Sequence, residues 1–350
     1  IFPYDKNANH VVERFFFGKF AFEYEGMPML AYKGSWRLSY FFDLIFDAPD
    51  DSLGRRLASA VYKHASTLKD EMWVYQGGVW TRDKELYMAV QQADWEGVVL
   101  DDAMKESMRR DVRLFFESKA IYDALETTWK RGILLLGPPG NGKTESIKAL
   151  LKESKYPALY VKSFATVFGP EAGVRSIFSH ARRQAPCILV IEDLDSMLTS
   201  NVRSFFLNEL DGFASNEGIL TIATTNHPER IDDAIVNRPS RFDAKYFYDL
   251  PSKALRKTFA QKWIAKVQAL KQGSSAEPMV VFTMPHEDIA EKVAEDCEGF
   301  SFATLKELFV SFLLALAHAH SARNVPEAPE TLLFSQISAL SAQIINASGE

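Results

Sequence analysis

The 350-residue sequence has little cysteine and no excess of positive charge. Its two cysteines, Cys187 and Cys297, lie too far apart along the chain to make a disulfide framework, which indicates a reducing, intracellular compartment. The formal net charge of −6 excludes an overall positive field of the kind that attracts nucleic acid. We therefore expect no nucleic-acid partner.

Long hydrophobic runs are also absent. No stretch reaches the roughly 20 apolar residues that a helix needs to span a bilayer. The longest candidate, LFVSFLLALAHA at residues 308–319, is shorter and carries a histidine, so we interpret it as a buried helix. Because the chain begins with Ile1, we expect a membrane anchor or targeting segment only in a missing segment upstream of that residue.

The composition that is present, 47% hydrophobic and 25% charged residues, is typical of a soluble globular protein with two or three domains. Residues 1–95 contain short aromatic strands separated by turns that contain glycine or proline. They also contain an amphipathic stretch over 52–66 and a hairpin pattern over 71–80 with Gly77 and Gly78 at its turn. This segment is predicted to be a small α+β domain.

The pattern changes over residues 96–250 to strands that alternate with helices. Apolar strand runs lie at 132–136, 158–162, 187–192 and 218–223, with helical stretches between them. This alternation predicts an α/β domain with a parallel sheet and helices on both faces. Residues 251–350 have helical patterns only, at 252–270, 286–297, 301–319 and 328–347, and predict a small all-α domain.

The octapeptide GPPGNGKT at residues 137–144 lies between an apolar strand and a helical stretch, and it fits the phosphate-binding pattern G-x-x-x-x-G-K-[ST] in full. Glycines let backbone N–H groups curl around phosphate oxygens, and the helix N-terminus adds its positive end. Lys143 is expected to reach the β- and γ-phosphates, and the Thr144 hydroxyl to ligate Mg²⁺. The predicted nucleotide-binding residues are Gly137, Pro138, Pro139, Gly140, Asn141, Gly142, Lys143, Thr144 and Glu145. ATP and Mg²⁺ are the predicted cofactors.

A second acidic motif, CILVIEDLD at residues 187–195, places carboxylates at the carboxyl end of an apolar strand, where parallel sheets bind ligands. One acid should belong to the Mg²⁺ shell and another should polarise the attacking water. By position, Glu192 takes the metal role, Asp193 the water role, and Asp195 a structural one. The usual order of the pair, Asp then Glu, is reversed here.

Two further polar segments follow. The stretch ILTIATTNHPERID at 219–232 is an apolar strand that ends in polar residues, and Asn226 is expected beside the γ-phosphate, where it would position water. The stretch NRPSRFD at 237–243 offers Arg238 and Arg241, whose planar, permanently charged guanidinium groups suit phosphate. The predicted catalytic residues are Lys143, Glu192, Asp193, Asn226, Arg238 and Arg241.

Together these motifs resemble the AAA branch of the AAA+ ATPases over residues 96–320, and GFSFATLKELF at 299–309 is similar to a helix of that family's lid domain. The resemblance implies Mg²⁺-dependent ATP hydrolysis in a homo-oligomeric ring, a hexamer or a heptamer, with residues 251–350 as the lid. It also implies that Arg238 and Arg241 of one subunit reach the ATP of its neighbour. Ser240 replaces the glycine of the family's R-P-G-R, which affects the expected reach of Arg241.

The reversed acidic pair within E-D-L-D, the TTNHPERID stretch and the N-terminal layout are similar to the mitochondrial AAA translocase of the Rieske iron–sulfur protein. We therefore expect a cytoplasmic or mitochondrial location and an ATPase that stays active, with a slower chemical step because Asp193 is one methylene shorter than Glu. The stretch VRSIFSHARRQAPC at 174–187 departs from that branch and looks more like general protein-remodelling AAA enzymes.

The resemblance implies a protein substrate, threaded past an aromatic loop. The equivalent stretch is SFATVFGPEAG at 163–173, and Phe168 is the candidate pore residue, although a place for Phe168 in the core is an equal alternative. Two other functions remain open. A nucleic-acid-directed motor would show ATPase stimulation by nucleic acid, and a weakly hydrolysing nucleotide switch acting as a scaffold would show almost no turnover in an assembled ring.

Overall fold

The structure divides the chain into two compact units, Ile1–Lys69 and Asp70–Glu350. The computed structural model describes residues 4–5, 10–11, 17–36, 39–66, 70–211, 215–231, 235, 241–270, 280–321 and 328–347. The boundary differs from the one near residue 95 that the sequence patterns suggest. The physical reason is that the hairpin assigned to the N-terminal domain pairs with the large sheet of the second unit.

The first unit is an α+β fold with an antiparallel sheet in the order β3-β4-β5. Its elements are β1 (Tyr4–Asp5), β2 (His10–Val11), β3 (Gly18–Tyr24), β4 (Met27–Trp36), β5 (Ser39–Ile45) and α1 (Ser52–Ser66). Met29 of the sheet packs with Leu53 and Leu57 of α1. These three residues form a small buried core, consistent with the amphipathic pattern of the helix.

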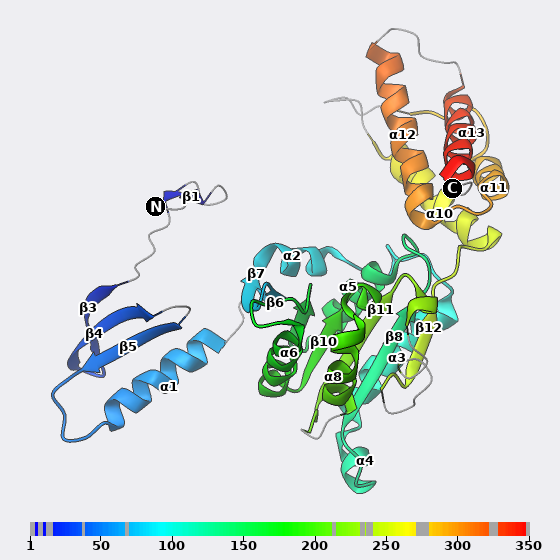
Figure 1. The fold of residues 1–350 in the computed structure, drawn as a ribbon. Helices are drawn as coiled ribbons and strands as arrows, with labels where there is room; N and C mark the ends of the chain where they lie inside the picture. Colours follow the sequence, from blue (N-terminus) through cyan, green and yellow to red (C-terminus); the bar gives the residue numbers. More distant parts are fainter. Residues whose placement is uncertain are drawn as a thin grey trace. The chain divides into compact units, whose positions relative to one another are not determined.

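The second unit is built on a seven-stranded sheet in the order β12-β8-β11-β10-β9-β6-β7. Its strands are β6 (Met72–Gln76), β7 (Val79–Asp83), β8 (Lys130–Leu136), β9 (Ala158–Val161), β10 (Cys187–Ile191), β11 (Ile219–Thr225) and β12 (Ala244–Phe247). Neighbouring strands are parallel except for the antiparallel hairpin β6–β7, which joins the sheet through β9 (Figure 1). The predicted parallel sheet is confirmed.

Helices cover both faces of this sheet, as predicted. They are α2 (Lys84–Gln92), α3 (Asp102–Glu117), α4 (Lys119–Ala124), α5 (Lys143–Ser154), α6 (Pro170–Gln184), α7 (Leu194–Met197) and α8 (Ser200–Asp211), with a short turn of 3₁₀-helix, η1 (Pro228–Arg230). Side chains alternate along the strands: Leu134 packs with α6 and α8, whereas Leu135 packs with α3 and α5. Cys187 is fully buried on the first face, and burial raises the pKa of its thiol to about 12.

The chain after β12 is helical, as predicted, with α10 (Lys253–Gln268), α11 (His286–Asp296), α12 (Phe302–Ser321) and α13 (Pro329–Ala347), coloured yellow to red in Figure 1. These helices share one apolar core. Of the helices in the described ranges, α12 is the one long and apolar enough to cross a membrane by length and composition, which is weak evidence. Leu305, Phe309 and Phe312 of this helix are fully buried in the core of the helical domain.

The strand order decides which polar residues meet. Strand β11 lies between β8, which leads into the phosphate loop, and β10, which carries the acids. The carboxyl ends of these parallel strands lie along one side of the sheet, here called the carboxyl edge, and their starts lie along the opposite amino edge. Three segments that are far apart in the sequence therefore come together at the carboxyl edge.

Candidate functional site

The phosphate loop connects the end of β8 to the start of α5. Gly140 and Gly142 have φ values of +79° and +94°, the left-handed region that glycine adopts without strain. A Cβ on Gly142 would meet nothing within 4 Å, so the backbone is open there to a bound group. Gly142 directly precedes α5 and gives no side-chain cap to its first turn. The first N–H groups of α5 therefore suit an anion.

Lys143 lies inside this loop and is only 7% exposed. Its ammonium donates hydrogen bonds to the carbonyl oxygens of Gly137, at 2.5 Å, and Pro138, at 2.9 Å. Burial lowers the pKa of Lys143, and the nearby carboxylates of the acidic motif oppose that shift. The loop thus holds a cation at the place where the motif requires one for phosphate.

Glu192 is held on both sides. Its Oε1 accepts a hydrogen bond from the hydroxyl of Thr144, at 2.5 Å, and its Oε2 accepts one from the hydroxyl of Tyr160 on β9. Burial, followed by the hydrogen bond to Glu192, raises the pKa of Tyr160. A hydroxyl and a carboxylate are the hard oxygen donors that Mg²⁺ takes in proteins, so Thr144 and Glu192 fit such an ion.

Asp193 has a left-handed backbone, with φ of +51° and ψ of +48°. The amide Nδ2 of Asn226 donates to its Oδ1 at 2.6 Å, and the Asp193 backbone N–H donates to the hydroxyl of Thr224 at 2.9 Å. Asp and Asn enter the left-handed region more readily than longer side chains. The backbone thus favours the shorter acid at position 193.

The third acid of the motif, Asp195, has a different environment. Its Oδ1 accepts from the hydroxyl of Thr225, at 2.8 Å, and from the backbone N–H of Asn226, at 3.3 Å. These bonds tie the end of β11 to the turn after β10. Asp195 therefore supports the loop that carries Asn226, whereas Glu192 and Asp193 line the pocket.

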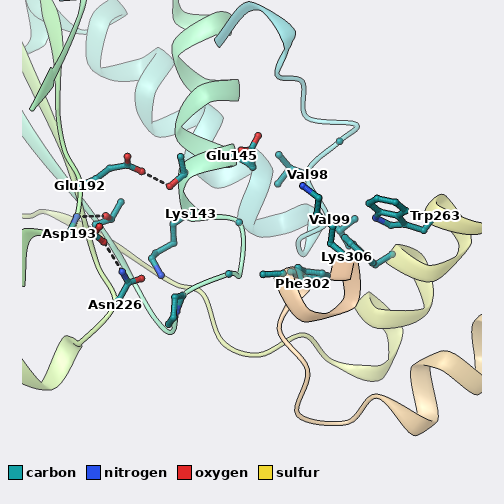
Figure 2. Close-up of a pocket in the computed structure, with 18 of the residues that line it drawn as sticks. Val98, Val99, Lys143, Glu145, Glu192, Asp193, Asn226, Trp263, Phe302 and Lys306 are labelled. Atoms are coloured by element: carbon teal, nitrogen blue, oxygen red, sulfur yellow. Dashed lines mark hydrogen bonds between the residues drawn. The ribbon is translucent and has the colours of Figure 1, made fainter. Parts of the chain in front are cut away.

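A cavity of about 600 Å³ opens at the carboxyl edge, and Figure 2 shows its walls. One wall carries the polar side chains, among them Lys143, Glu192, Asp193 and Asn226. The other wall is largely apolar and comes from the segment before α3 and from the helical domain: Val98, Val99, Phe259, Trp263, Phe302 and Lys306. A flat, apolar group such as a nucleotide base suits the second wall. Glu145 also lines the cavity and pairs with Lys148 at 2.7 Å.

The phosphate loop also contacts the helical domain directly. The carbonyl of Gly140 accepts a hydrogen bond from the backbone N–H of Ala303, at 3.0 Å. The side-chain Oδ1 of Asn141 accepts one from the backbone N–H of Phe302, at 3.4 Å. Both donors belong to the first turn of α12, whose N–H groups have no partner within the helix. The loop therefore caps α12, which couples the phosphate-binding backbone to the position of the lid.

The two predicted arginines have different outcomes. Arg238 lies outside the described residues. Arg241 is at the amino edge, 6% exposed, and its guanidinium pairs with Asp211 at the end of α8: Nη2 lies 2.7 Å from Oδ2, and Nε lies 3.1 Å from both oxygens. The structure thus places Arg241 away from the pocket of its own chain and against an acid of its own chain.

The candidate pore residue, Phe168, is 80% exposed, and its neighbour Val167 is 82% exposed. The turn is held at its base, because the hydroxyl of Thr166 donates to the carbonyl of Gly169 at 2.8 Å and accepts from the Phe168 backbone N–H at 3.0 Å. Phe168 therefore does not pack in the core of this chain, and the alternative that placed it there is wrong.

Some residues that line the pocket or contact its acids carry no signal in the sequence patterns. Tyr160 reads as an ordinary aromatic in the strand ALYV, and no spacing connects Val98 or Trp263 with the phosphate loop. Their shared position follows only from strand order and from the docking of the helical domain.

Comparison with known proteins agrees with this geometry. Residues 133–250 match the model of the ATPase family associated with various cellular activities (AAA). The chain is 33% identical over 239 residues to the ATP-dependent zinc metalloprotease FtsH 2 of Salinibacter ruber, a match that covers 63% of this chain and 32% of that protein. It is 34% identical over 228 residues to FtsH 1 of Methylacidiphilum infernorum, covering 60% of this chain and 33% of the relative. Protein SAV of Sulfolobus acidocaldarius is 29% identical over 247 residues, with 64% and 29% covered. The chain therefore spans about a third of the length of these relatives.

Proposed function

We propose that this chain, which carries an AAA ATPase domain, couples Mg²⁺-dependent ATP hydrolysis to the remodelling or translocation of a protein substrate in a ring of identical subunits. The observation that carries the proposal is the convergence at one cavity of the phosphate loop, the Thr144–Glu192 pair and the Asn226–Asp193 pair. These are the parts that phosphoryl transfer to water requires.

Each side chain has a role that follows from its position. Lys143 offsets negative charge on the β- and γ-phosphates, and the N–H groups at the start of α5 bind phosphate oxygens. Thr144 and Glu192 are the residues that would hold a Mg²⁺ ion, which would supply positive charge to the phosphate oxygens.

Asp193 is assigned to the attacking water. Asn226 donates to Oδ1 of this carboxylate, so we assign the other oxygen, Oδ2, to the water. Water adds to the γ-phosphorus as the bridging oxygen leaves with ADP, and the proton lost by water passes through Asp193 to the released phosphate. The shorter reach of Asp193 supports the expectation of a slow chemical step.

The ring proposal rests on the amino edge. Arg241 lies beside Gly132, the third residue of β8, and the rest of that strand separates it from the phosphate loop at Gly137, about 17 Å of extended chain. An arginine there cannot serve its own nucleotide. We propose that Arg238 and Arg241 act on the ATP of a neighbouring subunit in a hexamer or heptamer, where such fingers increase the rate by about 10³–10⁵ in related phosphoryl transfers. For Arg241 this action requires its pair with Asp211 to open.

The substrate proposal rests on the exposed Val167–Phe168 turn, which presents apolar side chains where a threaded polypeptide can be gripped. The E-D-L-D order and the N-terminal layout support a place near the Rieske-protein translocase branch. The peptidase activity in the names of the FtsH relatives belongs to those proteins. The 350 residues contain no H-E-x-x-H sequence, so zinc-dependent proteolysis is not part of the proposal.

Subunit mixing tests the proposed function. Lys143→Ala should lose ATP binding, and Arg238→Ala should bind ATP but hydrolyse it poorly. Mixed rings should recover part of the turnover, because the first variant still donates arginines and the second still has an intact phosphate loop. Phe168→Ala should keep the basal ATPase and lose processing of an unfolded protein. Turnover by Arg238→Ala equal to wild type, independent of protein concentration, would contradict the ring model.

A further inference from the structure

Tyr160 on β9 makes a hydrogen bond to the acidic motif. Strand β9 pairs in parallel with β10, where Tyr160 lies opposite Val190, two residues before Glu192. The half-buried phenol donates its hydroxyl hydrogen to Oε2 of Glu192. The hydrogen bond therefore runs from one strand to the end of the next, across the carboxyl edge of the sheet.

Glu192 bridges two structural elements in this arrangement. Oε1 accepts from Thr144 on α5, and Oε2 accepts from Tyr160 on β9. Because a carboxylate is planar, a donor that binds one oxygen also determines the direction of the other. The contact with Tyr160 thus keeps Oε1 turned toward the Thr144 hydroxyl, which is the position where both groups can hold a cation.

We propose that Tyr160 is a positioning residue for the metal-binding carboxylate of Glu192, and that this contact requires the long side chain at position 192. An aspartate there would be one methylene shorter and could not reach both Thr144 and Tyr160. The reversed acidic pair and the tyrosine then form one unit: Glu192 needs its length for the bridge, and the short side chain of Asp193 suits its left-handed backbone. This inference rests on the proposed function, because it refines how the same site holds Mg²⁺.

The test is Tyr160→Phe, which removes only the hydroxyl. Tyr246→Phe is the matched control. Tyr246 lies on another strand of the same sheet, β12, and does not line the cavity, and its hydroxyl also donates to a carboxylate, Oδ2 of Asp111, at 2.8 Å. Binding of a fluorescent ATP analogue should be measured with excess EDTA and across a Mg²⁺ titration, alongside ATPase activity and the melting temperature.

We expect Tyr160→Phe to bind the analogue in EDTA within about twofold of wild type, since Lys143 and the loop are unchanged. The Mg²⁺ concentration for half-maximal tightening of the analogue and for half-maximal ATPase should rise about tenfold, at the lower end of what outer-shell partners contribute to metal affinity. Turnover should largely recover at saturating Mg²⁺. Each of the two variants loses one hydroxyl hydrogen bond, so Tyr160→Phe and Tyr246→Phe should lower the melting temperature by similar amounts. Tyr246→Phe should leave the Mg²⁺ dependence unchanged.

A double-mutant cycle makes the length requirement testable. If Glu192→Asp already loses the contact, adding Tyr160→Phe to it should shift the Mg²⁺ dependence by less than about twofold. An unchanged Mg²⁺ dependence in Tyr160→Phe, or a full tenfold shift on top of Glu192→Asp, would overturn the positioning role while leaving the ATPase proposal intact. A wild-type protein that neither binds nor hydrolyses ATP would overturn both.

Discussion

Two lysines lie near the two ends of strand β8, one at each edge of the sheet, and each donates hydrogen bonds to two backbone carbonyls. Lys143, after the loop at the carboxyl edge, donates to the carbonyls of Gly137 and Pro138. Lys130, which begins the strand at the amino edge, donates to the carbonyls of Leu210, at 2.9 Å, and Asp211, at 3.0 Å. Burial is the largest cause that lowers the pKa of both.

The charged groups near each lysine are paired differently. At the amino edge, acids pair with arginines: Asp211 with Arg241, and Asp111 with Arg131 at 3.4 Å. Asp243 accepts from the backbone N–H of Gly132 at 3.0 Å. Both edges carry a cavity, of about 410 Å³ at the amino edge and about 600 Å³ at the carboxyl edge. At the carboxyl edge, however, the acids that line the cavity bind a hydroxyl or an amide rather than an arginine. A perturbed pKa therefore does not by itself mark a functional lysine. Convergence of incompletely paired charges around a cavity does.

The largest expected effect is on turnover at the carboxyl edge. Asp193→Asn keeps the shape of the side chain and its tolerance for the left-handed backbone, but it removes the charge that polarises water. Turnover should fall about 10³-fold, within the range of general-base catalysis, while ATP affinity stays within about threefold. Single-turnover hydrolysis and ATP binding provide the two readouts, and normal hydrolysis by this variant would mean that Glu192 is the base.

The next effect belongs to the amino edge and should appear as stability. Arg241→Ala leaves the partly buried carboxylate of Asp211 without its main partner, which should lower the free energy of unfolding by about 3 kcal/mol. Chemical denaturation measures this change. Arg238→Ala is the comparison within the same segment. If Arg241→Ala keeps wild-type stability but loses turnover that mixing with Lys143→Ala restores, its pair with Asp211 opens in the ring and its role is catalytic.

The lysine pair provides a matched comparison. Lys143→Met should weaken ATP binding about 100-fold, because the β- and γ-phosphates lose a buried cation. Lys130→Met loses hydrogen bonds to two carbonyls and should lower stability by about 1–2 kcal/mol, with ATP affinity within twofold of wild type. ATP affinity and denaturation curves of both variants are sufficient, and a weaker ATP affinity in Lys130→Met would contradict the distinction between the edges.

The smallest effect compares two buried asparagines. Asn141 at the carboxyl edge accepts from the first turn of α12, whereas Asn216 at the amino edge donates to the carbonyl of Glu209 at 2.7 Å. Asn141→Ala should weaken ATP binding about threefold by loosening the link between loop and lid, since the bond it removes is long. Asn216→Ala should lower stability by about 1 kcal/mol and leave binding unchanged. Equal effects of the two variants on ATP affinity would remove any special role for the loop–lid link.

Much of the fold could be predicted because its signals are local. Alternation of strands and helices and the apolar runs of β8, β10 and β11 reflect burial on both faces of a parallel sheet, and each run is visible within a few neighbouring residues. The compact units divide between Lys69 and Asp70, rather than near residue 95, for a related reason. The hairpin β6–β7 has the same local pattern whether it belongs to a small domain or extends a large sheet, and only its pairing with β9 distinguishes the two.

The sequence alone determined the kinds of groups at the candidate site: a glycine loop with Lys143 and Thr144, two acids after a buried strand, and Asn226 after the next. These follow from contiguous motifs, in which chemistry and spacing are written together. Tertiary structure alone decided that Tyr160 bonds to Glu192, that Asp193 has a left-handed backbone, that Trp263 lines the same cavity as the phosphate loop, and that Arg241 is paired with Asp211. Each of these depends on which strands and domains lie side by side, and that arrangement is a property of the whole packed chain, so no short stretch of sequence encodes it.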